Sequence, residues 1–240
     1  MIFIAIPFVF GMGSHNLSAW GTSSTSIVSI SDKAYGSTST LVNALLANAP
    51  QFLLSVCYLI VNGLCTGMAS AYEWNNLAIS RKGLRVTTPK GQQRSTYFLQ
   101  LPSRWALPLL IASAILHWLM SQSFFLVRVD KIDAQGDVKD WTSACGFSGL
   151  SFLIACLVFL GLVTTVAGVS LIRFPLRMPF AASCSLVISA ACHPLREENC
   201  PHLEPIKWGV VTGSATKGIV RHCSFSTKSV KRPKEGLEYQ

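Results

Sequence analysis

Cysteine and histidine side chains, the commonest ligands of structural zinc, gather near the C-terminus of this sequence. They are Cys192, His193, Cys200, His202, His222 and Cys223. Four of them could bind one zinc ion, but their C-x7-C spacing lacks the paired C-x2-C arrangement of common zinc domains. We therefore predict no metal and no cofactor, and the zinc hypothesis stays open only through these six residues.

Motifs of the familiar enzyme classes are absent from the sequence. It contains no G-x-S-x-G, H-E-x-x-H, phosphate-binding loop or G-x-G-x-x-G pattern. Serine and histidine are plentiful, but no spacing between them selects a nucleophile and its base. The prediction is accordingly that the protein is not an enzyme.

Five polar or small residues lie inside long apolar runs, where they could join helices to one another. Gly63 and Gly67 form a G-x-x-x-G pair, which lets two helix backbones approach closely. Asn62, His117 and Gln122 carry polar groups that can hydrogen-bond between helices. We predict helix packing for all five. For His117 a second hypothesis stays open, a proton or solute path, although no other histidine and no carboxylate lies in these runs.

The apolar runs that hold these residues predict a membrane protein. Only 13% of the residues are charged, against about 25% in soluble domains. The deficit falls in residues 51–71, 107–127 and 147–172, and each run reaches the roughly 20 residues that a membrane-spanning helix needs. The expected fold is an all-α membrane protein with about three transmembrane helices in a transmembrane region at 45–172. Pro50 and Pro108 suit the first turns of the first two helices, unless the first begins earlier, near Leu41.

Basic residues are distributed unevenly among the connecting segments. The connector 72–106 holds six, Arg81, Lys82, Arg85, Lys90, Arg94 and Arg104, against the single acid Glu73. The C-terminal tail 173–240 holds ten more, whereas 128–146 is acidic and the segment before residue 50 has only Lys33. The positive-inside rule therefore places the connector and the tail in the cytoplasm. The six connector residues either set this orientation alone or also form a lipid-facing basic loop, at about 1 kcal/mol per residue on an anionic membrane.

The two ends of the chain are expected to differ. The N-terminal segment 1–44 is predicted to be non-cytoplasmic, its abrupt start leaves truncation open, and Asn16 is a glycosylation candidate there. The tail 173–240 is predicted as a small cytoplasmic region. Its apolar, β-branched stretches at 206–211 and 219–226 favour a β-hairpin, and the residues from Lys228 onward are expected to be solvated.

Several longer runs resemble one protein family. They are LLANAPQFLLS (45–55), YLIVNGLCTGM (58–68), EW (73–74), RKGLRVTTPKGQQRSTYFLQLP (81–102), LHWLMSQSFF (116–125), AACHP (190–194), KWGVV (207–211) and HCSFS (222–226). Over residues 41–240 or thereabouts the chain resembles a family of uncharacterised fungal, mainly ascomycete, integral membrane proteins known only by a domain of unknown function. The resemblance implies a multi-pass membrane location and brings no activity, substrate or catalytic residue.

These observations favour an interaction or assembly component in a membrane. The alternative is a subunit of a transporter or channel, which would need further spans from an oligomer. The expected partners are the lipid bilayer and either a membrane protein or further copies of the chain. Nucleic acid is not expected despite the net charge of +9, because the basic residues lie beside the apolar runs. The plasma membrane is favoured over internal membranes.

Overall fold

A computed structural model describes most of the chain. The described residues are 27–28, 37–134, 136, 138–173, 178–179, 181, 184–193, 198–211, 222–234, 236–237 and 239. They fall into two compact units, one from Met1–Asn62 and Leu107–Val169, the other from Gly63–Ala106 and Ser170–Gln240. Each unit is described by itself. Asn16 and most of the predicted N-terminal segment 1–44 lie outside the described residues.

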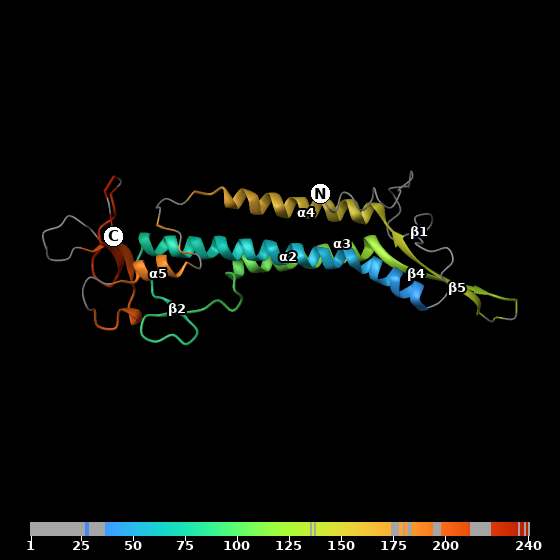
Figure 1. Ribbon diagram of the computed structural model, residues 1–240, viewed down its shortest axis with the longest axis horizontal. Coiled ribbons are helices and arrows are strands. Elements are labelled where there is room, and N and C mark those ends of the chain that lie inside the picture. Colours follow the sequence, from blue (N-terminus) through green and yellow to red (C-terminus); the bar gives the residue numbers. More distant parts are fainter. Residues whose placement is uncertain are drawn as a thin grey trace. The chain divides into compact units, whose positions relative to one another are not determined.

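Within the described residues, three helices are long and apolar enough to cross a membrane. They are α2 (Ser37–Ile79), α3 (Ser103–Ser123) and α4 (Gly149–Ser170), shown in Figure 1. At 1.5 Å per residue, α3 and α4 are each a little over 30 Å long, which matches the hydrocarbon core of a bilayer. The 43 residues of α2 are about twice that length. Three apolar helices were predicted, and this part of the fold is confirmed.

The helix ends differ from the prediction in two ways. Both prolines lie inside helices, because α2 begins at Ser37, well before Pro50, and α3 begins at Ser103, five residues before Pro108. The earlier of the two predicted starts for the first helix is therefore the correct one. In addition, α3 ends at Ser123 rather than at residue 127. The residues that follow it, Phe124–Val127, are apolar but belong to a strand.

That strand makes the all-α expectation wrong. Strands β4 (Phe124–Ile132) and β5 (Val138–Phe147) pair antiparallel across the segment predicted as an acidic loop. In Figure 1 they extend as paired arrows from α3 and back to α4. The two-residue strand β1 (Ile27–Val28) adds to β5, so the sheet order is β1-β5-β4. Aromatic and β-branched residues explain the strand, because such side chains favour the pleated backbone.

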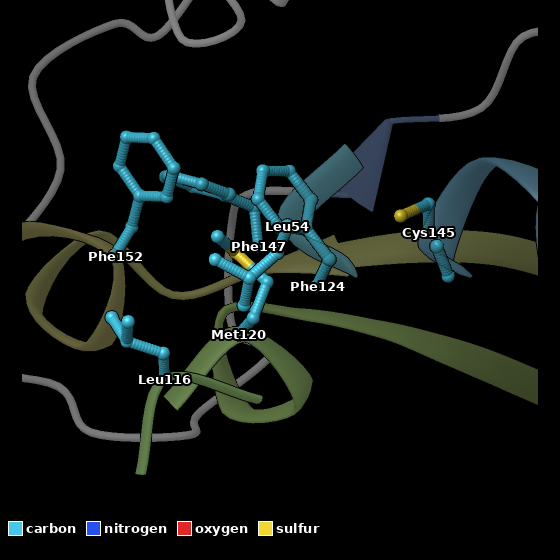
Figure 2. Packing of buried hydrophobic residues seen from close by; sticks show 8 residues of the cluster. Leu54, Leu116, Met120, Phe124, Cys145, Phe147 and Phe152 are labelled. Carbon is cyan, nitrogen blue, oxygen red and sulfur yellow. The ribbon is translucent and has the colours of Figure 1, made fainter. Parts of the chain in front are cut away.

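The core of the first unit lies where the hairpin meets the helices. The rings of Phe124, Phe147 and Phe152 have centroids 5.0–5.7 Å apart in tilted and edge-to-face pairs. Leu116 and Met120 of α3 belong to the same buried cluster, and Figure 2 shows them beside these rings. Aromatic pairs in such orientations add about 0.5–1.5 kcal/mol each beyond their buried area. The start of α2 is tied to this sheet as well, because Asn43 Nδ2 donates to the Ser143 carbonyl at 2.8 Å.

The second unit has a separate, smaller core. Strands β6 (Lys207–Val211) and β7 (His222–Ser226) pair antiparallel, as the tail's hairpin prediction required. They pack with helix α5 (Ser185–Ala191) and the end of α2 around Ala78, Ala191 and Trp208. Lys231 lies in the stretch from Lys228 onward that was expected to be solvated, and its side chain is exposed. Its backbone N–H and carbonyl nevertheless pair with Val210 at 3.1 and 2.8 Å.

Candidate functional site: the loop–tail module

The basic connector and the C-terminal tail fold together in the second unit. We call residues 73–102 and the described residues of 178–239 the loop–tail module. Lys82 and Ile206 exchange two backbone hydrogen bonds of 3.1 Å, which continue the edge of β6. Farther along the loop, the Gln92 N–H donates to the Leu203 carbonyl in the 3-10 helix η1 (Pro201–Leu203) at 2.9 Å. The connector is thus bound to the tail at two separate points.

One guanidinium joins the start of the loop to the turn after β7. The Arg81 guanidinium donates to the carbonyls of Thr227 and Lys228. Two longer contacts of 3.5 Å reach the carbonyls of Pro205 and Ser226. Arginine suits this position because its planar fork of N–H donors can bind several carbonyls at once.

The single acid of the connector lies between two of its arginines. Glu73 Oε1 accepts from Arg85 Nε at 2.6 Å and from Arg94 Nη2 at 3.2 Å. Both arginines also donate to loop carbonyls, Arg85 to Ser95 at 2.9 Å and Arg94 to Gly83 at 2.8 Å. These bonds hold the parallel pair of two-residue strands β2 (Arg85–Val86) and β3 (Arg94–Ser95) against the end of α2.

Close backbone packing in the loop depends on two glycines. A Cβ added at Gly83 would lie 2.0 Å from the Gln92 carbonyl oxygen, a distance that no real Cβ contact shows. Gly91 has a φ of +59°, and a Cβ there would lie 2.9 Å from the Leu203 oxygen. The backbone path of the connector therefore depends on glycine at both positions.

A half-buried carboxylate binds the same turn after β7 that Arg81 contacts. Glu198 Oε1 accepts a hydrogen bond from the Ser226 hydroxyl. Its Oε2 accepts from the Thr227 N–H at 3.0 Å and from the Thr227 hydroxyl at 2.7 Å. Burial by itself raises the pKa of Glu198, but these hydrogen bonds and the Lys228 charge outweigh it and lower the pKa overall. The ionised form is thus the one that the folded module stabilises.

The six residues of the predicted lipid-facing basic loop divide into two groups. Arg81, Arg85 and Arg94 are bonded within the module as described above. The side chains of Lys90 and Arg104 are exposed, and that of Lys82 is half-buried. Binding of anionic lipid stays a prediction for the set.

Two of the six metal candidates, His193 and His222, lie close together in the structure. The His193 and His222 rings lie 6.0 Å apart, and His222 Nε2 donates to the His193 carbonyl at 2.7 Å. Among the residues that the structure describes, which include all six candidates, no group of three possible ligands forms a metal site. Burial raises the pKa of the Cys192 and Cys223 thiols, which disfavours the thiolate that a metal requires.

The predicted helix-packing residues lie on two of the long helices, with Asn62, Gly63 and Gly67 on α2 and with His117 and Gln122 on α3. His117 and Gln122 are half-buried on α3. A Cβ added at Gly63 or Gly67 would meet no atom within 4 Å. Helix packing by these residues therefore stays a prediction.

Sequence analysis missed the residues that hold the module together. Nothing in the sequence around Glu198 indicates its role, because its partners Ser226 and Thr227 lie 28 and 29 residues further along the chain and no known motif has that spacing. A signal did exist for Glu73, since it is the single acid among six basic residues and an ion pair could have been proposed from that imbalance.

Comparison with known proteins gives a family and no activity. No curated protein and no solved structure matches this chain. A family match extends over residues 8–238, which is a longer range than the resemblance described from residue 41. Since this match covers nearly the whole sequence, the chain belongs to the family described as "Domain of unknown function (DUF8419)".

Proposed function

We propose that this chain is a multi-pass integral membrane protein that acts as an interaction or assembly component, with the loop–tail module as its binding part. The observation that carries the proposal is the folding of connector and tail into one unit with its own core. A connector that only joined two spans would need no such fold. The module instead offers a fixed surface beside the membrane.

The pairing within each unit supports a three-span topology. Two spans, α3 and α4, separate the connector from the tail, so both segments return to the same side of the bilayer. Likewise α2 and α3 separate β1 from β5, and these strands pair with each other. The positive-inside rule then assigns the module to the cytoplasm, because the connector 72–106 and the tail 173–240 together carry 16 of the 20 basic residues.

Assembly is favoured over catalysis by what the module's charged groups do. Glu73, Glu198, Arg81, Arg85 and Arg94 bind one another or the module's own backbone and hydroxyl groups. Such bonds fix the shape of a surface, whereas a catalytic group must keep an atom available to a substrate. We accordingly assign these residues to the architecture of a binding surface.

The plasma membrane of a fungus is the proposed location. The resemblance to fungal membrane proteins supports a fungal origin of the chain. The length of α4 supports the choice of the plasma membrane. Its 22 helical residues extend about 33 Å, which is close to the thicker hydrocarbon core of plasma membranes. A transporter or channel subunit remains the second candidate, favoured by the half-buried His117 and Gln122 on α3.

Purification from native membranes in mild detergent, followed by crosslinking and mass spectrometry, tests the proposal. A different membrane protein recovered with the chain supports assembly, whereas a closed oligomer of this chain alone supports the pore. Arg81→Ala should release that partner, because it removes the bonds from the loop to the turn after β7. Lys90→Ala is the matched control, since it removes an exposed positive charge from the same loop. Equal retention of the partner by both variants would contradict a role for the module.

A further inference from the structure

An exposed apolar tip lies in the loop–tail module. It consists of Tyr97, Phe98 and Leu99, all of them exposed, and Phe98 reaches 102% of its reference area. From Ser95 to Leu101 the sequence STYFLQL contains no charge. Because the tip joins three exposed side chains in one uncharged stretch, removing them from water would be favourable.

The tip is held in place at both of its ends. On one side, the Thr96 N–H donates to the Val86 carbonyl at 3.2 Å, and Arg85 Nη2 donates to the Tyr97 hydroxyl at 2.8 Å. The Arg85 guanidinium also stacks 3.9 Å from the centre of the Tyr97 ring. On the other side, Leu101 is only 3% exposed. The exposure of Phe98 is therefore a fixed feature of the loop, because the residues around it have defined partners.

The chain itself places the tip close to a membrane-spanning helix. Phe98 precedes Ser103, the first residue of α3, by five residues, which span at most about 18 Å when fully extended. Trp105 follows in the first turn of α3 and is also exposed, and the Arg104 guanidinium lies 5.9 Å from its ring. Aromatic and arginine side chains at the end of a span are typical of the headgroup level of a bilayer.

We propose that Phe98 and Leu99 insert into the headgroup region of the same membrane that α3 crosses, with Tyr97 and Trp105 beside them. The proposal rests on the membrane placement given under the proposed function. It assigns lipid contact to the apolar tip, because three of the connector's arginines already have partners inside the module. Phospholipid is the favoured occupant over protein, since a stable protein interface buries about 800 Å² per partner and the tip comprises only three residues.

A photo-crosslinking phenylalanine analogue tests the assignment. The full chain carries p-benzoylphenylalanine in place of Phe98 and is reconstituted in liposomes of phosphatidylcholine and phosphatidylserine. The control carries the same analogue at Thr87, which is exposed in the same loop. After irradiation, mass spectrometry should find several-fold more lipid adduct at position 98 than at position 87.

The remaining outcomes overturn the proposal. Equal lipid adducts at the two positions would mean that the tip has no particular contact with the bilayer. In native membranes, a protein adduct at position 98 in place of a lipid adduct would identify the tip as a protein-binding site. Extraction of the chain by alkaline carbonate is measured in parallel, because loss from the membrane fraction would refute the membrane placement itself. If the chain stays in the membrane fraction but forms no lipid adduct at position 98, the insertion of the tip is refuted and the membrane placement is not.

Discussion

Replacing Glu198 by glutamine should loosen the loop–tail module without altering its shape. The carboxylate accepts three hydrogen bonds, from the Ser226 hydroxyl and from the N–H and hydroxyl of Thr227. Glutamine keeps one acceptor oxygen and presents an NH₂ group, itself a donor, to the remaining donors. Ser226 is buried, so a donor left without an acceptor there has poor access to water.

The size of the effect follows from these contacts. Hydrogen bonds to a charged group contribute about 1.5–3 kcal/mol each, and neutral ones about 0.5–1.5 kcal/mol. Glu198→Gln removes the charge and one acceptor oxygen. Because the contributions of neighbouring hydrogen bonds do not add fully, we expect the free energy of opening β7 to fall by about 2 kcal/mol rather than by their sum. A change of that size corresponds to roughly a 30-fold larger open population.

Hydrogen exchange of the full chain in lipid nanodiscs measures this population. The backbone amides of β7 exchange only when the strand opens, so their protection should fall roughly 30-fold in Glu198→Gln. Glu204→Gln is the matched control, because Glu204 is exposed in the same segment and the change in charge is identical. Unchanged exchange in Glu198→Gln, or an equal loss in Glu204→Gln, would refute the assigned role of the carboxylate.

The same carboxylate makes the module sensitive to acid. Because folding lowers the pKa of Glu198, its contribution is complete above the ordinary glutamate pKa of about 4.3. It is lost as the pH falls through the lower folded value. After correction for intrinsic exchange rates, β7 protection should therefore drop below about pH 4.3 in the native chain. Glu198→Gln should lose this component of the drop, and an identical acid profile in the variant would contradict the linkage.

Three other experiments test separate parts of the structure. Gly91→Ala should cost about 1–2 kcal/mol, because alanine is strained at a φ of +59° and its Cβ would press on the Leu203 carbonyl; faster exchange at Gln92 measures it. Phe147→Ala should cost about 3–5 kcal/mol in β5 protection, whereas Val138→Ala, on an exposed position of the same strand, should change it little. For topology, Ile132→Cys in the hairpin should react with an impermeant maleimide on intact cells, and Thr87→Cys only after permeabilisation; the reverse pattern would invert the assignment.

The sequence predicted the elements that depend on local composition. Hydropathy marks the three apolar helices, and apolar, β-branched stretches at 206–211 and 219–226 mark the tail's hairpin. The structure contains the helices and, within those stretches, the strands Lys207–Val211 and His222–Ser226. Helix α2 is longer than its apolar run because its last turns leave the hydrophobic stretch. There Trp74 and Ala78 pack into the core of the second unit instead. Hydropathy alone has no means of detecting such an extension.

Two features escaped prediction for a different reason. The apolar residues Phe124–Val127 suit a membrane helix and a buried strand equally well, so the end of α3 could not be placed by composition. Their assignment to β4 comes from pairing with β5 and from the packing of Phe124 on Phe147 and Phe152. The backbone pairing of Lys82 with Ile206 was equally hidden from sequence analysis, since the two apolar helices α3 and α4 lie between these residues in the sequence. Contacts of this kind arise only when the whole chain folds.

Under the proposed topology, the connector's arginines would serve orientation and folding at different times. Arg81, Arg85 and Arg94 would contribute to the charge bias that favours the cytoplasm for this loop. In the folded module they are bonded, Arg81 to the carbonyls of Thr227 and Lys228 in the tail. Because synthesis proceeds from the N-terminus, the loop emerges before the tail, and Arg81 then has no such partner. In the proposed topology its charge would therefore be available for orientation while the helices insert, and it would become a structural contact once the tail has been made.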